Sequence, residues 1–207
     1  MDFIIRIPVL LISLTVHEFA HGYTAFKMGD HTAKHDGRLS LNPAKHIDPL
    51  GLLFLLIFRF GWAKPVMVDT RSLEDPKKDM AIIASAGPLA NIALAFVMML
   101  ILHPFLLMFA EGGAKEIITR VLVEFFYLNL FFAIFNLLPI PPLDGSKVFG
   151  SFLPNKLYYT LMRSERICYM VLIVLIWTGA ISAILSPLVT ALFRIITAIV
   201  EKIYFFL

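Results

Sequence analysis

Residues 3–26 read FIIRIPVLLISLTVHEFAHGYTAF, a run that is apolar apart from a few polar positions. About 20 such residues in a helix are long enough to cross the hydrocarbon core of a bilayer. The run contains His17, Glu18 and His21. Ionisable side chains are costly in lipid, and within a membrane segment they indicate a functional site. The stretch therefore predicts a membrane helix that carries chemistry.

The composition of the whole chain agrees with a membrane protein. Of its 207 residues, 59% are hydrophobic and 16% are charged, and the mean hydropathy is +0.82. A soluble domain of this length has too little interior to hide so much apolar surface, so we expect the lipid bilayer as its surroundings. The net charge of +3, without a long Lys/Arg run, indicates no nucleic-acid partner. The single cysteine, Cys168, excludes an intramolecular disulfide and a cysteine-based metal motif.

Three further regions are apolar and long: residues 80–109, 117–140 and 167–207. The last is interrupted at Ser186-Pro187, which fits either two segments or one kinked pair. Residues 50–60 are also apolar, but they are too few to cross a bilayer. We interpret them as a re-entrant or interfacial piece, which is tolerated at depth where protein shields its backbone.

Two short segments near this piece, residues 38–41 and 65–68, contain β-formers and predict short strands at the membrane surface. Their edge could hold an extended peptide by strand addition, or the strands could only brace the re-entrant piece. The expected fold is an all-α polytopic membrane protein, a helical bundle of about five transmembrane segments with a re-entrant piece and short membrane-associated β-strands. Residues 1–207 form one domain, with a catalytic core over about residues 3–150 and C-terminal helices over 167–207.

The basic residues are concentrated in the loops at residues 27–49, 61–79 and 141–166. If residues 50–60 do not cross, these loops share one side of the membrane. Positively charged loops face the cytoplasm, so we expect this side to be cytoplasmic and the N-terminus to be outside. The histidine pair then lies in the cytoplasmic half of the first segment.

The two histidines lie four residues apart, so on a helix they share one face and can bind one metal ion. The same topology brings Asp144 to their depth, because it follows the proline-rich turn after the third long segment. Two histidines and one carboxylate, with a fourth position open to water, form a hydrolytic zinc arrangement. We expect one Zn²⁺ per chain. Glu18, beside the first histidine, would accept a proton from the metal-activated water and pass it to the leaving amine.

Three asparagines, Asn91, Asn129 and Asn136, lie among small residues at helical spacing in the long segments. Small residues let helices approach closely, and asparagine side chains hydrogen-bond between them. Asn136 lies near the same end of its segment as Asp144 and is a candidate catalytic residue, as a donor to the scissile carbonyl or its oxyanion. Alternatively, Asn91 and Asn136 could make only hydrogen bonds between helices, without contact to a substrate. His31, His35 and His46 lie in a polar loop, where we expect them to be solvated.

These residues carry a family resemblance. The motif at residues 17–21, together with residues 135–145, resembles the site-2 protease family of intramembrane zinc metalloproteases. Residues 84–91 resemble the central helix of that family. Residues 37–43 and 46–49 resemble its compact bacterial and archaeal subgroup, without the PDZ or CBS domain of larger members.

The resemblance implies a three-helix catalytic core, zinc held by His17, His21 and Asp144, and Glu18 as the base. It also implies cleavage of membrane-spanning protein substrates in regulated intramembrane proteolysis. We therefore expect a multi-pass protein of a prokaryotic cell membrane, with its active site toward the cytoplasmic half and with transmembrane proteins as partners. The alternative is a non-catalytic metal-binding transporter or a helix-binding scaffold. The sequence leaves the oligomeric state open.

Overall fold

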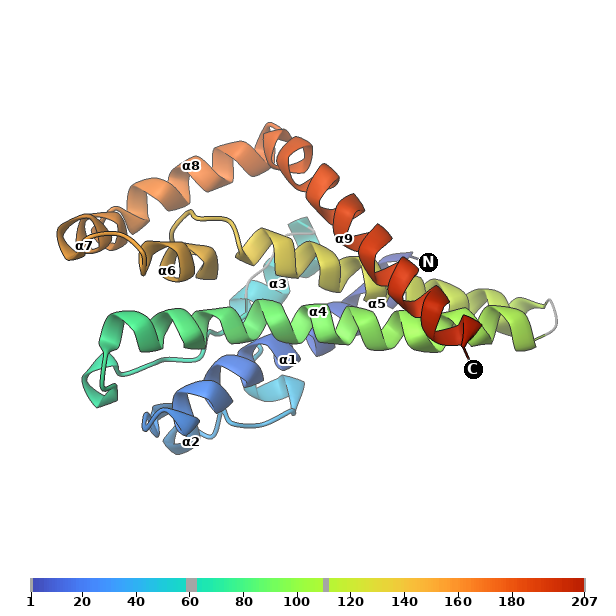
Figure 1. Ribbon diagram of the computed structural model, residues 1–207, viewed down its shortest axis with the longest axis horizontal. Coiled ribbons are helices and arrows are strands. Elements are labelled where there is room, and N and C mark those ends of the chain that lie inside the picture. Colours follow the sequence, from blue (N-terminus) through green and yellow to red (C-terminus); the bar gives the residue numbers. More distant parts are fainter. Residues whose placement is uncertain (1, 59–62, 110–111, 207) are drawn as a thin grey trace.

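The computed structural model describes residues 2–58, 63–109 and 112–206 (Figure 1). Within these residues the chain is almost entirely helical. The helices are α1 Asp2–Lys27, α2 Thr32–His35, α3 Pro49–Phe58, α4 Pro76–Met108, α5 Gly113–Asn136, α6 Asp144–Gly150, α7 Asn155–Arg163, α8 Glu165–Trp177 and α9 Ala180–Phe205, with 3-10 turns η1 Pro43–Lys45 and η2 Thr70–Ser72.

Helices α1, α4 and α5 form the central layer, in which each packs against the other two. Figure 1 shows α4 and α5 lying side by side, with α8 and α9 forming a bent pair above them. Helix α9 returns across α4 and α5 and packs against both. The buried apolar core of this contact consists of Ala95, Met99, Leu102, Phe126, Leu130, Ile196 and Val200.

The prediction of an all-α fold is confirmed for the described residues. Among them, α4, α5 and α9 are long and apolar enough to cross a membrane. Helix α1, at 26 residues, also has sufficient length, whereas α8 has only 13 residues. The expected number of about five transmembrane segments therefore stays a prediction.

Helix α4 begins four residues before the apolar run that predicted it. Its N-cap is Asp75, whose side chain accepts a hydrogen bond from the backbone N–H of Lys78, and Pro76 occupies the first turn. The backbone N–H of Asp75 in turn donates to the Asp79 carboxylate at 3.0 Å. Hydrogen bonds from Lys78 hold the pKa of the Asp75 carboxyl below its usual range. The polar start of α4 is thus defined by capping, and hydropathy alone does not reveal it.

The break in the C-terminal region lies at Gly179, so the predicted break at Ser186-Pro187 is wrong. Gly179 has a φ of 75°, the left-handed conformation that ends a helix, and it separates α8 from α9. Pro187 lies inside the continuous helix α9. Neighbouring helices and local adjustment allow a proline within an apolar helix. Glycine backbone freedom, and not the proline, therefore sets the turn.

The short apolar run forms helix α3, and residues 59–60 of the predicted piece lie outside the described residues. Ten residues of helix span about 15 Å, half of the roughly 30 Å of a hydrocarbon core. This length fits an element that does not cross, and its re-entrant position stays a prediction.

The short strands expected at residues 38–41 and 65–68 are absent from the described part of the chain, where one isolated bridge joins Ile47 and Ala63. Side chains take the hydrogen-bonding groups that a strand ladder would need. The Arg38 guanidinium donates to the carbonyls of Lys64 and Pro65, and Pro65 has no N–H. The carbonyls of residues 64 and 65 thus bond to a side chain and not to a neighbouring strand.

Candidate metal centre

Three buried side chains from two helices meet at one point. The Nε2 atoms of His17 and His21 are 3.0 Å apart, and each is 3.2 Å from Oδ2 of Asp144. All three residues are less than 10% exposed. The histidines come from successive turns of α1, and Asp144 is the first residue of α6. Their potential ligand atoms lie within 4.8 Å of one another.

Both imidazoles are oriented through their other ring nitrogen by α4. Nδ1 of His21 is 2.7 Å from the carbonyl oxygen of Ile83, and Nδ1 of His17 is 2.7 Å from Oδ1 of Asn91. A carbonyl oxygen only accepts, so each Nδ1 carries the proton and donates it. The neutral ring then presents the lone pair of Nε2 to the shared point. This is how histidine ligands of a metal are commonly oriented.

The orientation of Asn91 is itself determined by a buried polar network. Its Nδ2 donates to Oδ1 of Asn129 at 2.7 Å and to the carbonyl of Ser13 at 3.3 Å. Nδ2 of Asn129 donates to the Ser13 hydroxyl at 2.9 Å. All three residues are fully buried. Because the Ser13 carbonyl must receive the amide N–H, Oδ1 of Asn91 faces His17, and the network ties α1, α4 and α5 together.

Gly87 of α4 leaves the space that the two imidazoles occupy. A Cβ atom placed on it would lie 2.4 Å from Nε2 of His21 and 2.6 Å from Cε1 of His17. Real Cβ atoms do not approach other atoms so closely. The rings therefore pack against the bare backbone of α4, and any larger residue at this position would displace them.

Asp144 is held at the site by a tightly folded turn. After α5 ends at Asn136, the chain passes through residues 137–143 and restarts as α6 at Asp144. A Cβ atom on Gly145 would lie 2.2 Å from the carbonyl oxygen of Leu137, so the turn closes directly on the first residues of α6. The Lys147 ammonium lies 3.9 Å from the second carboxylate oxygen of Asp144. A positive charge therefore accompanies the buried carboxylate.

Glu18 lies beside this cluster, half-buried, on the turn of α1 between the two histidines. Its Oε2 accepts a hydrogen bond of 2.8 Å from the backbone N–H of Val66. The Val66 segment is in turn held by the Arg38 guanidinium, which is 7% exposed. A loop segment outside the helices thus holds one oxygen of the Glu18 carboxylate.

Asn136 is outside the cluster of His17, His21 and Asp144. Its Nδ2 donates to the carbonyl of Phe132, one turn earlier in α5, at 3.0 Å. Its side chain also lines a cavity between α1 and α5. The predicted contact with a scissile carbonyl stays a prediction.

Three groups in this part of the molecule were not predicted from the sequence. The Ile83 carbonyl and the Val66 N–H are main-chain atoms, which carry no side-chain signature. The third is His46, for which the prediction of a solvated side chain is wrong. It is 2% exposed, because its Nε2 reaches the carbonyl of Ser40 at 2.8 Å inside the folded loop. The polar loop around it in the sequence had suggested an exposed side chain.

The donor set fits a zinc ion. Two neutral imidazole nitrogens and one carboxylate are the ligands of hydrolytic zinc sites, which keep a fourth position for water. Here all three converge in a site lined by helices, and both imidazoles already make their orienting hydrogen bonds. Burying a carboxylate beside two imidazoles is costly without a compensating charge, and a divalent cation provides one.

Comparisons with known proteins identify the family of the chain. The family model of peptidase family M50 matches residues 102–179, which include Asp144. The candidate zinc metalloprotease YwhC of Bacillus subtilis is 38% identical over 189 residues, covering 88% of this chain and 84% of the relative. The candidate zinc metalloprotease Rip2 of Mycolicibacterium smegmatis is 31% identical over 186 residues, covering 87% of this chain and 69% of the relative.

A third relative is archaeal. MJ0611 of Methanocaldococcus jannaschii, also named as a candidate zinc metalloprotease, is 34% identical over 152 residues, which cover 70% of this chain and 69% of the relative. No solved structure matches the chain at a significant level. The protein belongs to peptidase family M50, the site-2 protease family, and is a zinc metalloprotease by membership. The expected family is therefore confirmed.

Proposed function

We propose that this protein is an intramembrane zinc endopeptidase that hydrolyses peptide bonds of transmembrane-helix substrates. The observation that carries the proposal is the convergence of His17, His21 and Asp144 on one buried point, with both Nδ1 atoms engaged by α4. The cluster brings two histidine Nε2 atoms and one carboxylate oxygen within 4.8 Å of one another at a buried position. It fits a single bound cation per chain.

In this proposal Nε2 of His17, Nε2 of His21 and the Asp144 carboxylate hold one Zn²⁺. Zinc in such a site supplies Lewis-acid activation of water at neutral pH. The protein holds the ligands in position: α4 orients both imidazoles, and the turn before α6 places the Asp144 carboxylate. A site lined by apolar helices also excludes bulk water, which strengthens its electrostatic interactions.

Glu18 is the proposed general base. Its carboxylate accepts a proton from the attacking water as the oxygen adds to the substrate carbonyl carbon. It then returns that proton to the amide nitrogen as the C–N bond breaks, which leaves a carboxylic acid and an amine. The Val66 N–H holds one oxygen of the Glu18 carboxylate in place. Because the carboxylate is rigid, this contact also limits the position of the second oxygen, which is the proposed proton acceptor. Asn136 is proposed to donate to the carbonyl oxygen.

The substrate class follows from the surroundings of the site. α4, α5 and α9 have the length and apolarity of membrane spans, and the ligands lie on or beside this layer. Substrates that reach such a site arrive within the bilayer, as transmembrane segments. We propose a multi-pass protein of a prokaryotic cell membrane, with the basic loops and the active site toward the cytoplasm.

The proposal is tested with purified protein in liposomes that contain a model single-span substrate. We expect cleavage within the apolar segment, complete loss of cleavage with a zinc chelator, and recovery on addition of Zn²⁺. The Asp144→Ala protein should keep its helical content but bind no stoichiometric zinc. A protein that binds zinc and substrate yet never cleaves would instead support the transporter or scaffold alternative.

A further inference from the structure

A cavity of about 400 Å³ lies between the loop after α2 and the loop segment at residues 64–67. Its polar groups are the side chains of Asp36, Arg38 and Lys64, and Pro65 and Met67 complete its wall. The lining thus carries two positive charges and one negative charge. This balance suits an anionic occupant.

The Arg38 guanidinium has unused hydrogen-bond donors at this cavity. Arg38 is 7% exposed, and its Nη1 donates to the carbonyls of Lys64 and Pro65 at 3.1 and 3.4 Å. Within the described residues, Nε and Nη2 have no acceptor, and neither is among the polar atoms that are sealed inside the protein without a partner. Both therefore remain accessible from the cavity that Arg38 lines. Nε and Nη2 share one edge of the guanidinium, which matches two oxygens of a phosphate or a carboxylate.

The two positive charges of the cavity also lack a counter-ion. In the part of the chain that the structure describes, neither Arg38 nor Lys64 forms an ion pair, although Asp36 lines the same cavity. Arginine is rarely buried without a charged partner, because a buried charge is costly unless it is paired. An anion in the cavity would provide that partner.

The cavity lies at the level of the lipid headgroups in the proposed orientation. Residues 3–22 of α1 span about 30 Å, roughly the thickness of the hydrocarbon core, so Gly22 is near its cytoplasmic boundary. A Cβ atom placed on Gly22 would lie 3.2 Å from Cβ of Ala33 and 3.5 Å from Cγ1 of Val66. The Arg38 N–H donates to the Ala33 carbonyl at 2.8 Å, so the cavity lies beside this level of α1.

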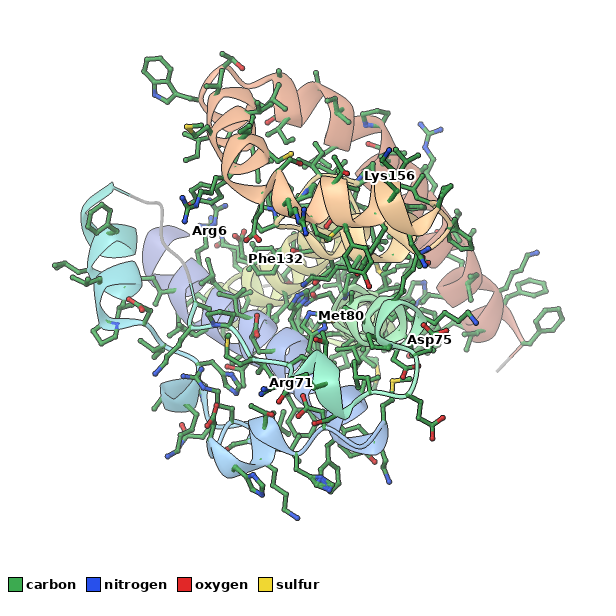
Figure 2. All side chains as sticks on the ribbon, turned by 90° about the vertical axis from the view of Figure 1, so that its left-hand side faces the viewer. Arg6, Arg71, Asp75, Met80, Phe132 and Lys156 are labelled. Carbon is green, nitrogen blue, oxygen red and sulfur yellow. The ribbon has the colours of Figure 1, made fainter. Side chains whose placement is uncertain are left out.

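The surroundings favour a lipid phosphate over a substrate carboxylate. Figure 2 views the molecule from the end that carries these loops, where the labelled Arg71 and Lys156 add further positive charge. Anionic phospholipids of the cytoplasmic leaflet are attracted to such a surface. Transmembrane substrates have basic rather than acidic flanks on that side. Met67, 61% exposed, places an apolar side chain in the wall, which fits the glycerol and upper acyl chain of a lipid.

We infer that this cavity binds the phosphate of an anionic membrane phospholipid through the Nε and Nη2 edge of Arg38 and the Lys64 ammonium, and that the bound lipid restrains the segment that positions Glu18. The opposite part of the same guanidinium, Nη1, holds the carbonyls of residues 64 and 65. The next N–H, that of Val66, donates to Glu18. The lipid site goes beyond the proposed function, whereas its effect on Glu18 rests on that function.

Lipid binding is measured without cleavage, by titrating the purified protein in neutral maltoside micelles with phosphatidylglycerol and counting bound lipid by native mass spectrometry. Lys64→Gln should weaken binding about fivefold, the effect of one basic residue near a membrane surface. Arg38→Lys keeps the charge but loses the two-pronged contact, so it should weaken binding at least about tenfold. Lys45→Gln, exposed in the same polar loop but outside the cavity, is the matched control and should bind like the parent protein.

Asp36→Asn provides a test of opposite sign. It removes the one carboxylate of the cavity, so it should bind phosphatidylglycerol about two- to fivefold more tightly. Damage to the fold does not produce tighter binding, and the unfolding temperature of each variant is measured beside its affinity. Equal affinities in the parent protein, Asp36→Asn, Lys64→Gln and Arg38→Lys would overturn the lipid site.

Three further ligands identify the source of the anion. Diacylglycerol with the same acyl chains should bind without sensitivity to Lys64→Gln, because it lacks the phosphate. Inorganic phosphate at the concentration of the lipid should not displace phosphatidylglycerol, and displacement would assign the cavity to a free anion. A substrate peptide with a glutamate flank should not displace the lipid either. Displacement by this peptide would assign the cavity to the substrate and contradict the inference.

The effect on Glu18 is measured by cleavage of the model substrate in phosphatidylcholine liposomes with and without phosphatidylglycerol. The kcat of the parent protein and of Lys45→Gln should rise with phosphatidylglycerol, and that of Lys64→Gln should rise less. An equal rise in all three would overturn the effect on Glu18. Absence of cleavage by the parent protein under every condition would refute the proposed function, while the binding measurements would still decide the lipid site.

Discussion

Oδ1 of Asn91 accepts a hydrogen bond of 2.7 Å from Nδ1 of His17, across the contact between α4 and α1. This bond fixes the tautomer of His17 and thereby directs Nε2 toward Asp144. It also connects the candidate metal site to the network that holds α1, α4 and α5 together. The packing of the three helices and the orientation of the ligand are thus determined by the same amide.

Asn91→Ala should therefore affect both metal binding and stability. Loss of a group that orients a histidine ligand typically lowers metal affinity about 10- to 100-fold. The unpaired amide of Asn129 should cost about 1–3 kcal/mol of stability. Zinc competition titration and thermal unfolding in detergent measure the two effects. Thr190→Ala, on the exposed face of α9, is the control and should change neither. Unchanged zinc affinity in Asn91→Ala would show that the amide does not orient His17.

Gly87→Ala should disrupt the site by steric contact alone. The added Cβ would lie 2.4 Å from Nε2 of His21, and the helix backbone beneath it cannot yield easily. We expect loss of stoichiometric zinc binding and of proteolysis. Gly113→Ala is the matched control, because a Cβ there meets no atom within 4 Å. Full zinc binding by Gly87→Ala, measured by metal analysis of the purified protein, would be incompatible with the described packing.

Val66→Pro should impair catalysis while leaving zinc in place. Proline removes the N–H that holds Glu18, whereas Val66→Ala keeps it. General acid–base catalysis contributes about 100- to 10,000-fold, so loss of the contact that positions the base should lower kcat at least about tenfold in the proline variant. The alanine variant should remain close to the parent protein. Equal loss of zinc and of activity in Val66→Pro would mean that the segment supports the fold and does not position the base.

Asp30 is fully buried and stabilises the loop after α1 through hydrogen bonds. It accepts hydrogen bonds from the backbone N–H and hydroxyl of Thr32 and from the backbone N–H of Asp69. Asp30→Ala leaves these donors without an acceptor, so we expect about 1–3 kcal/mol of destabilisation and a lower unfolding temperature. Zinc content per folded molecule should not change. Asp36→Ala, at an exposed position of the same loop, is the control and should keep the unfolding temperature of the parent protein. An unchanged unfolding temperature in Asp30→Ala would show that these hydrogen bonds do not stabilise the fold.

The ligand set was predictable because its signals are local. His17 and His21 are four residues apart in an apolar run, and Asp144 follows a proline-rich turn that ends a long apolar segment. Apolar length likewise predicted α4 and α5, and it predicted an apolar C-terminal region without the correct break. The Ile83 carbonyl and the Val66 N–H were not predictable, since any residue type supplies a main-chain group. Their positions depend on tertiary packing.

Two of the incorrect predictions were based on local residue preference. Residues 65–68 have the composition of a strand, but Pro65 lacks an N–H and the N–H of Val66 bonds to a carboxylate. Pro187 suggested a break, whereas Gly179 makes it through a left-handed turn. In both cases local propensity was overridden by where the backbone hydrogen bonds are made.

The most direct test of the proposed mechanism is the Glu18→Gln protein, reconstituted beside a transmembrane substrate. Glutamine has nearly the same shape and can still accept from the Val66 N–H, but it cannot take a proton from water. Metal analysis should give one zinc per chain, as in the parent protein, while cleavage falls by at least about 100-fold. Cleavage at the parental rate by zinc-loaded Glu18→Gln would contradict the assignment of Glu18 as the base.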